Sequence, residues 1–298
     1  MSRVLVLRPS AKINLTLHVG ARRTDGFHDV RTVLQSIALS DTITITERSG
    51  RFTLVSRSPG VPADRTNLIW RAAELLWKAL GRTGEPRDAH VKLEKQIPTE
   101  AGLGGGSADA AAALVGLNTV WGGRQSRRDL MRLGATLGSD VPFFLVGGTA
   151  LGAGRGDELY PLDDAHRLGV VVLKPSFGVP TADAYRWFDE DGAAAPPDVS
   201  AATRRGEVDL GWPSGPIVLH NDLEAPVARR HPGITQMVQA CLSEGALAAA
   251  MTGSGSAVYG LFTEAGATRA AKRLKRPEWL VLLTRTLSRR EAGRRGAL

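Results

Sequence analysis

The residues best suited to do chemistry form a glycine-rich segment, Gly102-Leu103-Gly104-Gly105-Gly106-Ser107, followed at once by an alanine-rich run to Leu117. Four glycines in five positions permit backbone conformations that other residues avoid. The alanine-rich run favours a helix, whose first turn has unpaired backbone N–H groups at the positive end of the helix dipole. This arrangement predicts a phosphate-binding site, and a turn without a ligand is the alternative interpretation.

The glycine segment fits neither of two common nucleotide-binding patterns. A Walker A loop ends in Gly-Lys-Ser/Thr, and no lysine follows these glycines. A dinucleotide-binding loop needs glycine at its sixth position, where this sequence has Ser107. The alternating residues 90–97 predict a half-buried strand, so the expected unit is strand, loop and helix. A cation for the phosphates must therefore come from elsewhere in the chain, and Ser107 could help to hold Mg²⁺ or a phosphate.

Lys12 and Asp140 are the candidate pair for proton transfer. Lysine is rare in this chain, with seven residues, and Lys12 begins an apolar stretch where an ammonium group needs an anionic partner. Asp140 lies among apolar residues before Pro142. Structural roles fit each residue equally well: an edge-strand lysine that faces water, and an N-cap for a short helix beginning at Pro142. If the two side chains meet, Asp140 could accept the proton of an attacking hydroxyl, and Lys12 could stabilise charge in phosphoryl transfer.

Two segments carry aromatic rings that could hold a flat heterocycle. Asp25-Gly26-Phe27-His28 predicts a turn that presents a ring and an imidazole. Residues 180–185 offer the hydroxyl of Thr181 and the ring of Tyr185. Taken singly, both segments also fit ordinary packing.

Composition and charge restrict the class of protein. A chain of 298 residues suggests one large or two medium domains. The single cysteine, Cys241, excludes an internal disulfide and suits a reducing cytosol. The net charge of +8 would fit a nucleic-acid binder, but 31 of the 38 basic residues are scattered arginines with few aromatic residues between them. Because no apolar run approaches the ~20 residues that span a bilayer, we expect a cytoplasmic protein with neither a nucleic-acid nor a membrane partner.

Strand and helix patterns alternate irregularly, which favours an α+β fold over a doubly wound sheet. The patterns predict strands at 3–8, 13–19, 42–47, 51–56, 90–97, 168–173, 217–219, 247–251, 257–262 and 279–286. They predict helices at 67–80, 108–117, 126–137, 234–243 and 265–274. Residues 147–157 predict a turn region, and residues 189–215 a surface loop or insertion.

In chain order these motifs resemble those of the GHMP small-molecule kinases. The resemblance rests on residues 9–15, 98–108 and 252–256, and covers the chain from residue 9 to about 262. Residues 11–15, 25–28, 137–142 and 221–224 are similar to members whose substrate carries a cytidine diphosphate. The resemblance implies a two-domain architecture. Residues 1–160 would form an ATP-binding domain of the ribosomal-protein-S5-domain-2-like type, and residues 161–298 a ferredoxin-like domain, with the active site between them.

The resemblance also implies a reaction and its residues. ATP would phosphorylate the 2-hydroxyl of a cytidine-diphosphate-linked methylerythritol in the non-mevalonate isoprenoid pathway, with Mg²⁺ held mainly by the ATP phosphates. Asp140 would be the catalytic base and Lys12 its charge partner. The implied ATP-binding residues are Asn67, Lys95, Pro98, Gly102, Leu103, Gly104, Gly105, Gly106, Ser107 and Ala108. The implied substrate-binding residues are Asn14, Phe27, His28, Thr181 and Tyr185, with the rings of Phe27 and Tyr185 on either side of the cytosine.

Glu100 departs from the usual glycine loop. Its carboxylate would repel phosphate if it faced inward, so we expect it to point to solvent. Three other functions remain open: a superfamily kinase for homoserine, mevalonate or a sugar, a decarboxylase on the same fold, and a non-enzymatic nucleotide or RNA binder. Residues 25–28 argue against the first, because those acceptors have no base to stack. The sequence leaves the oligomeric state open between a monomer and a homodimer.

Overall fold

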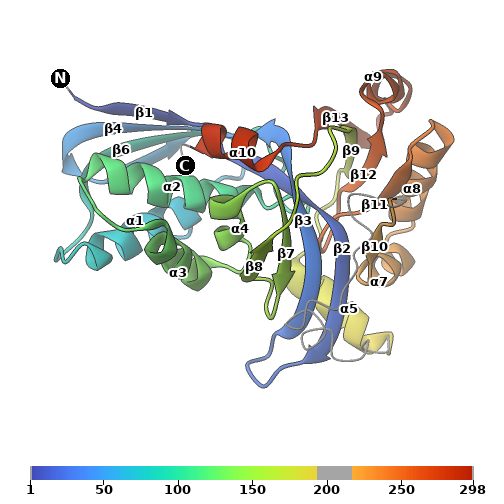
Figure 1. Ribbon diagram of the computed structural model, residues 1–298, viewed down its shortest axis with the longest axis horizontal. Helices are drawn as coiled ribbons and strands as arrows, with labels where there is room; N and C mark the ends of the chain where they lie inside the picture. The colour runs from blue at the N-terminus through green and yellow to red at the C-terminus, as the bar shows by residue number, and fades with distance from the viewer. Residues whose placement is uncertain (1, 193–216, 297–298) are drawn as a thin grey trace.

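The computed structural model describes residues 2–192 and 217–296 (Figure 1). Two sheets lie at opposite ends of an elongated body, and the long strands β2 and β3 run between them. The described residues include no helix with the length and apolar character needed to cross a membrane.

The first sheet has the strand order β1-β4-β6-β5. Its strands are β1 (Val4–Leu7), β4 (Thr42–Arg51), β5 (Thr53–Ser56) and β6 (Arg87–Glu94). Helices α1 (Leu68–Ala79), α2 (Gly105–Val120) and α3 (Arg127–Leu137) lie on one side of it (Figure 1). Because most residues of α2 are small and buried, α2 packs closely against both α1 and β4. The predicted helices at 67–80 and 126–137 are confirmed, and the helix predicted at 108–117 forms a longer one.

The central sheet has the order β10-β2-β3-β7-β8. Its strands are β2 (Ser10–Arg22), β3 (His28–Ser40), β7 (Thr149–Ala153), β8 (Glu158–Pro161) and β10 (His220–Asn221). The antiparallel β2–β3 pair contains three register shifts, and β10 joins β2 in parallel. Since β10 follows residue 160 in the chain, both predicted domains contribute to this sheet.

Two predictions at this sheet are wrong. Residues 149–153, within the predicted turn region 147–157, form β7, and only the segment between β7 and β8 turns. The glycine at position 152 allows the backbone of β7 to lie close to the following turn, because a Cβ there would be 3.0 Å from the carbonyl oxygen of Gly156. Residues 217–219, predicted as a strand, have no regular structure, and the strand is formed by the next two residues.

The second end sheet has the antiparallel order β11-β12-β9-β13. Its strands are β9 (Gly169–Pro175), β11 (Ala248–Met251), β12 (Val258–Phe262) and β13 (Trp279–Arg285). Helices α7 (Glu224–Arg230), α8 (Gly233–Ser243) and α9 (Glu264–Arg273) lie beside it (Figure 1). The apolar faces of α8 and α9 pack with β9 and β12 in a second core. The predicted elements at 234–243 and 265–274 are confirmed within one residue.

Three shorter helices connect these layers. Helix α4 (Val141–Val146) follows α3, and α5 (Thr181–Glu190) follows β9. Helix α10 (Arg289–Gly296) lies against the N-terminal part of the chain, where the carbonyl of Arg295 accepts the N–H of Arg8 at 2.8 Å. Of the predicted loop at 189–215, residues 189 and 190 end α5, and residues 193–215 lie outside the described residues. A domain boundary near residue 160 stays a prediction.

Candidate active site

A single cleft of about 1080 Å³ collects most of the predicted site residues. It is lined by the glycine loop, the middle of β2, the start of β3, the start of α5 and the turn at 253–255. The predicted site residues in its wall are Lys12, Asn14, Phe27, His28, Lys95, Pro98, Gly102, Leu103, Gly104, Gly105, Gly106, Ser107, Asp140, Thr181 and Tyr185. Segments that are far apart in the sequence therefore meet where the resemblance implies one site.

The glycine loop is held against β2 at the start of α2. The backbone N–H of Lys12 donates to the carbonyl of Leu103 at 3.0 Å. Gly104 occupies the N-cap of α2 with φ +71°, and no side chain caps the helix there. A Cβ at Gly104 would come within 2.7 Å of the Phe144 ring. The first N–H groups of α2 thus border the cleft without a capping group, as an anion site requires.

A turn at residues 252–256 closes on the other side of the glycine loop. The hydroxyl of Thr252 donates to the carbonyl of Gly102 at 3.3 Å. The N–H of Ala257 donates to the carbonyl of Ala101 at 3.3 Å. Gly102 has φ +70°, and a Cβ there would lie 2.0 Å from the Thr252 carbonyl oxygen. Glycine is required at position 102 because two backbones meet there.

Lys12 and Asp140 do meet. Lys12 Nζ lies 3.5 Å from Asp140 Oδ2, with the lysine buried and the carboxylate side chain 39% exposed. The same Nζ donates to Asn14 Oδ1 at 2.7 Å, and Asn14 Nδ2 donates to the hydroxyl of Thr32 at 2.7 Å. Asp140 occupies the N-cap of α4 but makes no capping hydrogen bond. Its carboxylate is therefore free to face the cleft, and α4 begins at Val141, one residue before the predicted start.

Lys95 lies beneath the glycine loop in a buried charge cluster that the sequence did not predict. Its Nζ donates to Asp109 Oδ2 at 2.7 Å and to Asp41. A Cβ at Gly105 would be 3.0 Å from this Nζ, so the cation lies directly behind the start of α2. Burial raises the pKa of Asp109 to about 8, although Lys95 opposes the shift. Asp109 could have been noticed as the one acidic residue in the alanine-rich run, since a buried carboxylate needs a cation.

The aromatic residues occupy the other end of the cleft. Phe27 is half exposed, and the guanidinium of Arg155 lies 4.5 Å from its ring centroid. Tyr185 stacks on His28 with a centroid distance of 5.2 Å, and His28 Nε2 is 2.8 Å from Asp189 Oδ1. Burial raises the pKa of Tyr185, with the nearby Asp140 carboxylate adding to the effect. Sequence reasoning missed Arg155, because its part of the chain was interpreted as a plain turn.

Three predicted residues have surroundings that differ from expectation. The side chain of Asn67 caps α1 by accepting the N–H of Ile69 at 2.9 Å, and it does not line the cleft. Ala108 is buried inside α2 and does not line the cleft either. Glu100 is exposed, as expected, but it also lines the cleft, and its carboxylate packs against Gly178, where a Cβ would lie 2.3 Å from Oε2. The Glu100 carboxylate is thus turned toward the β9–α5 connection.

The hydroxyl of Thr181 joins α5 to the closing turn, 3.1 Å from the hydroxyl of Ser254.

Comparison with known proteins identifies the family. Residues 67–148 match the profile of the GHMP kinases N terminal domain, and residues 209–277 match that of the GHMP kinases C terminal domain. The chain is 44% identical over 291 residues to 4-diphosphocytidyl-2-C-methyl-D-erythritol kinase of Moorella thermoacetica, covering 95% of this chain and 99% of the relative. The chain belongs to this kinase family.

Further comparisons support the family and its fold. The corresponding kinase of Pelotomaculum thermopropionicum is 42% identical, over 96% of this chain and 99% of the relative. A crystal structure of 4-(cytidine 5'-diphospho)-2C-methyl-D-erythritol kinase superposes with a TM-score of 0.74 at 34% identity, covering 96% of this chain and 99% of that one. Homoserine kinase from Cytophaga hutchinsonii, at 19% identity and TM-score 0.68, covering 96% of this chain and 95% of that one, shares the fold alone. The family consists of phosphotransferases that act on an alcohol group, and GHMP kinases use ATP as the phosphoryl donor. The predicted family and the α+β fold class are confirmed.

Proposed function

We propose that this chain transfers the γ-phosphoryl group of ATP to the 2-hydroxyl of 4-diphosphocytidyl-2-C-methyl-D-erythritol, a step in non-mevalonate isoprenoid synthesis. One observation carries the proposal: a single cleft contains an anion-binding helix start, a Lys12–Asp140 pair and a group of aromatic side chains. Each part matches one portion of the two substrates. The helix start suits the ATP phosphates, the Lys12–Asp140 pair suits the acceptor hydroxyl, and Phe27, His28 and Tyr185 suit the cytosine.

The mechanism is direct phosphoryl transfer. The acceptor hydroxyl gives its proton to the Asp140 carboxylate while its oxygen attacks the γ-phosphorus, and the bond from phosphorus to the bridging oxygen breaks to release ADP. The ammonium of Lys12, held by Asn14, offsets negative charge on the transferring group. The N–H groups at the start of α2 bind the donor phosphates.

Mg²⁺ would be held mainly by the ATP phosphates. This ion takes oxygen ligands and keeps several waters, and the cleft beside the loop provides the Ser107 hydroxyl. When bound, Mg²⁺ neutralises charge on the phosphates. One hydroxyl donor of this kind fits an ion that arrives with the nucleotide.

The aromatic end of the cleft favours this acceptor over the other superfamily substrates. Homoserine and mevalonate have no base to lie against Phe27 or Tyr185, and both rings line the cleft. We keep the division into residues 1–160 and 161–298 as part of the proposal, with the cleft between the two halves.

The test is an acceptor panel. The full chain is incubated with ATP, Mg²⁺ and, separately, 4-diphosphocytidyl-2-C-methyl-D-erythritol, homoserine, mevalonate and galactose, and ADP release is measured. We expect ADP release above background with the cytidine compound alone, and a new phosphomonoester signal by phosphorus NMR. Faster ADP release with another acceptor, or none with the cytidine compound, would reject the proposal.

A further inference from the structure

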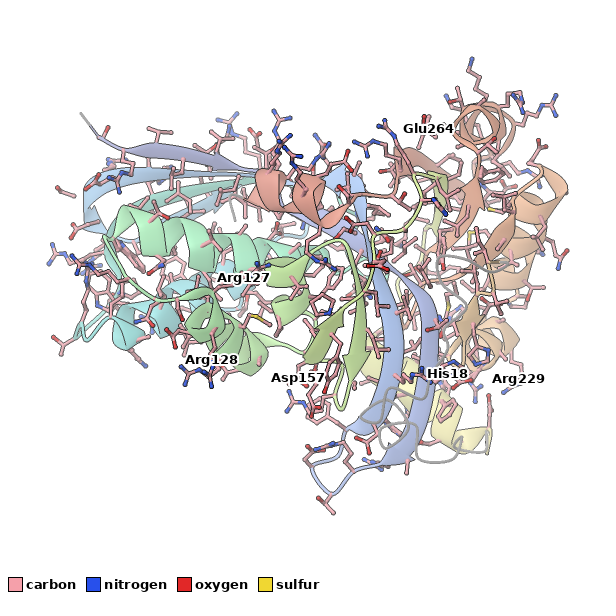
Figure 2. The ribbon with its side chains drawn as sticks, in the orientation of Figure 1. His18, Arg127, Arg128, Asp157, Arg229 and Glu264 are labelled. Atoms are coloured by element: carbon pink, nitrogen blue, oxygen red, sulfur yellow. The ribbon has the colours of Figure 1, made fainter. Side chains whose placement is uncertain are left out.

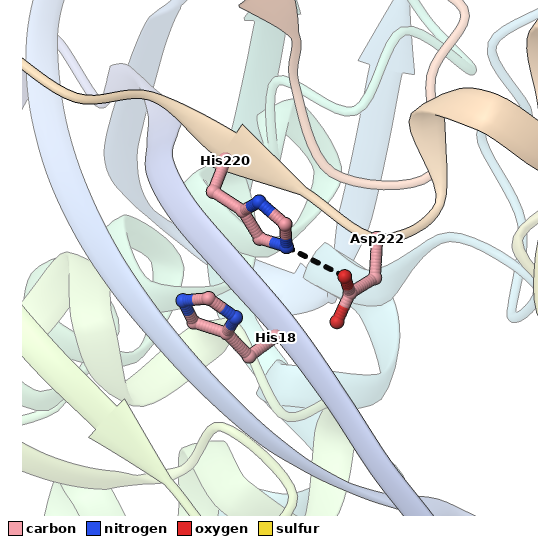
Figure 3. A group of neighbouring side chains, drawn as sticks. All are labelled: His18, His220 and Asp222. Carbon is pink, nitrogen blue, oxygen red and sulfur yellow. Dashed lines mark hydrogen bonds and ion pairs between the residues drawn. The ribbon is translucent and has the colours of Figure 1, made fainter. Parts of the chain in front are cut away.

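Two histidines and an aspartate gather at the junction of β2 and β10, and none of the three lines the cleft (Figure 3). His18 lies on β2 (Figure 2), His220 lies on β10, and Asp222 follows β10 directly. The parallel register places Asn221 beside Leu17, and the N–H of Asp222 donates to the Leu17 carbonyl at 3.0 Å. The backbone therefore fixes the three side chains on one short stretch of the sheet.

The donor atoms of these side chains are close enough to share an ion. One ligand atom from each residue lies within 4.8 Å of the other two. His220 Nε2 is 2.6 Å from Asp222 Oδ1, and the imidazole rings of His18 and His220 stack at 4.4 Å (Figure 3). Asp222 Oδ2 accepts the N–H of Val19 at 2.8 Å, so the carboxylate is already oriented by the backbone. Such outer contacts fix ligands in metal sites.

We propose that His18, His220 and Asp222 bind a divalent transition-metal ion that prefers imidazole nitrogen, with Zn²⁺ as the representative. Two histidines and one carboxylate form a common three-ligand set for Zn²⁺, and a water completes the tetrahedron. The ion takes the place of the hydrogen bond between His220 and Asp222, and the imidazole keeps its proton on Nδ1. Mg²⁺ and Ca²⁺ prefer oxygen ligands and should not bind this set.

Binding requires a modest movement that the site permits. A metal ion must lie in the plane of each imidazole, so the stacked His220 ring has to turn about its side-chain bonds. The His220 side chain is 46% exposed and borders a surface hollow of about 530 Å³, which gives the ring room and the ion a route.

The nearby charges allow a cation. Arg31, opposite His18 on β3, adds a positive charge, and Asp222 and Glu224 add negative ones. Arg229, which borders the same hollow, is paired with Asp191. Among the described residues around the cluster, the negative charge of Asp222 and Glu224 therefore exceeds the positive charge of Arg31, the one cation there without an ion pair.

The site would tie β10 to the catalytic cleft. Asn221, between His220 and Asp222, donates from Nδ2 to the carbonyls of Met251 at 2.8 Å and Gly253 at 2.9 Å. Met251 ends β11, and Gly253 lies in the turn at 252–256 that closes on the glycine loop. Because β10 pairs with β2 through two residues only, a metal bridge from His18 to His220 would add a strong link there.

The experiment measures Zn²⁺ binding to the full chain by isothermal titration calorimetry, without nucleotide. We expect one Zn²⁺ per chain, a rise of a few degrees in Tm with Zn²⁺, and no heat with Mg²⁺. His220→Ala and Asp222→Asn should each weaken binding at least tenfold. Asp222→Asn keeps an oxygen that can accept the Val19 N–H, so the fold should be retained. His166→Ala, at an exposed histidine elsewhere, is the matched control and should bind as the wild type does.

Each outcome decides the proposal. Zn²⁺ binding that is lost in His220→Ala and kept in His166→Ala supports the site. The absence of stoichiometric binding, or equal binding by both variants, overturns it. The ATP-dependent kinase activity is measured separately with the acceptor panel, so a failed metal site leaves the proposed function intact.

Discussion

Replacing Gly102 with alanine should open the nucleotide site. The added Cβ would lie 2.0 Å from the Thr252 carbonyl oxygen and 2.9 Å from its carbonyl carbon. Heavy atoms pack at roughly 3.5 Å, so the glycine loop and the closing turn would have to separate by about 1 Å or more. Both atoms belong to backbone, so no side chain can rotate away to relieve the contact.

The cost has two parts that a matched control separates. Alanine at φ +70° costs roughly 1 kcal/mol by itself. Separation of the two segments also loses the hydrogen bonds at Gly102 and Ala101, each worth about 1 kcal/mol. Gly81 has φ +72° with open space around its missing Cβ, so Gly81→Ala incurs only the first part. We expect Gly102→Ala to destabilise by roughly 2–4 kcal/mol more than Gly81→Ala.

The assay combines denaturant unfolding with kinetics. A displacement of about 1 Å at the phosphate site can reduce kcat/KM on the order of 100-fold. Gly81→Ala should leave kcat/KM for ATP unchanged, and Gly106→Ala, which meets only Leu68 at 3.7 Å, should fold normally. Equal stability and equal kcat/KM for Gly102→Ala and Gly81→Ala would refute the inference that the two backbones must touch.

Three further results are expected. Asp140→Asn should retain ATP affinity by calorimetry and lower kcat by about 10²- to 10⁴-fold; near-normal turnover would exclude Asp140 as the base. Phe27→Ala should raise KM for the cytidine substrate about tenfold or more in steady-state assays without changing KM for ATP, and equal effects on both would place the base elsewhere. The pKa of Asp109 is raised from its unfolded value to about 8, so its stabilising contribution is complete below about pH 4 and is lost as pH rises toward 8. Asp109→Asn should therefore flatten the decline in unfolding free energy between pH 5 and 9, measured with denaturant; an unchanged slope would contradict the assignment.

Regular patterns were predictable from the sequence. The helix at 234–243 has a clear apolar stripe, and α8 matches it within one residue. Strand β3 was missed, although it spans residues 28–40, because register shifts against β2 interrupt its alternation. Asn67 was assigned to the nucleotide site, but its side chain is used to cap α1. Local sequence shows which residue types are present, and neighbouring elements decide how each one is used.

The site was predicted where its residues form local motifs. The glycine loop came from such a motif. The Lys12–Asp140 pair was a condition stated from two separate segments and implied by the family resemblance, and the structure brings the two residues together. The cluster of Asp41, Lys95 and Asp109 joins residues separated by 54 and 14 positions along the chain. Their contact depends on where β6 ends relative to α2, which no local pattern contains. The predicted roles of the site residues themselves stay predictions.

The backbone contact between the glycine loop and the turn at 252–256 has a consequence while the chain is being synthesised. Gly102 and Thr252 are separated by 150 positions. At roughly 5–20 residues per second, the ribosome needs on the order of ten seconds or more to make the intervening chain. During that interval the emerging loop has its β2 contact but lacks its closing partner. A nascent chain that ends before residue 252 should therefore be unable to hold nucleotide, and ATP can serve as a ligand for this kinase only after most of the polypeptide has been made.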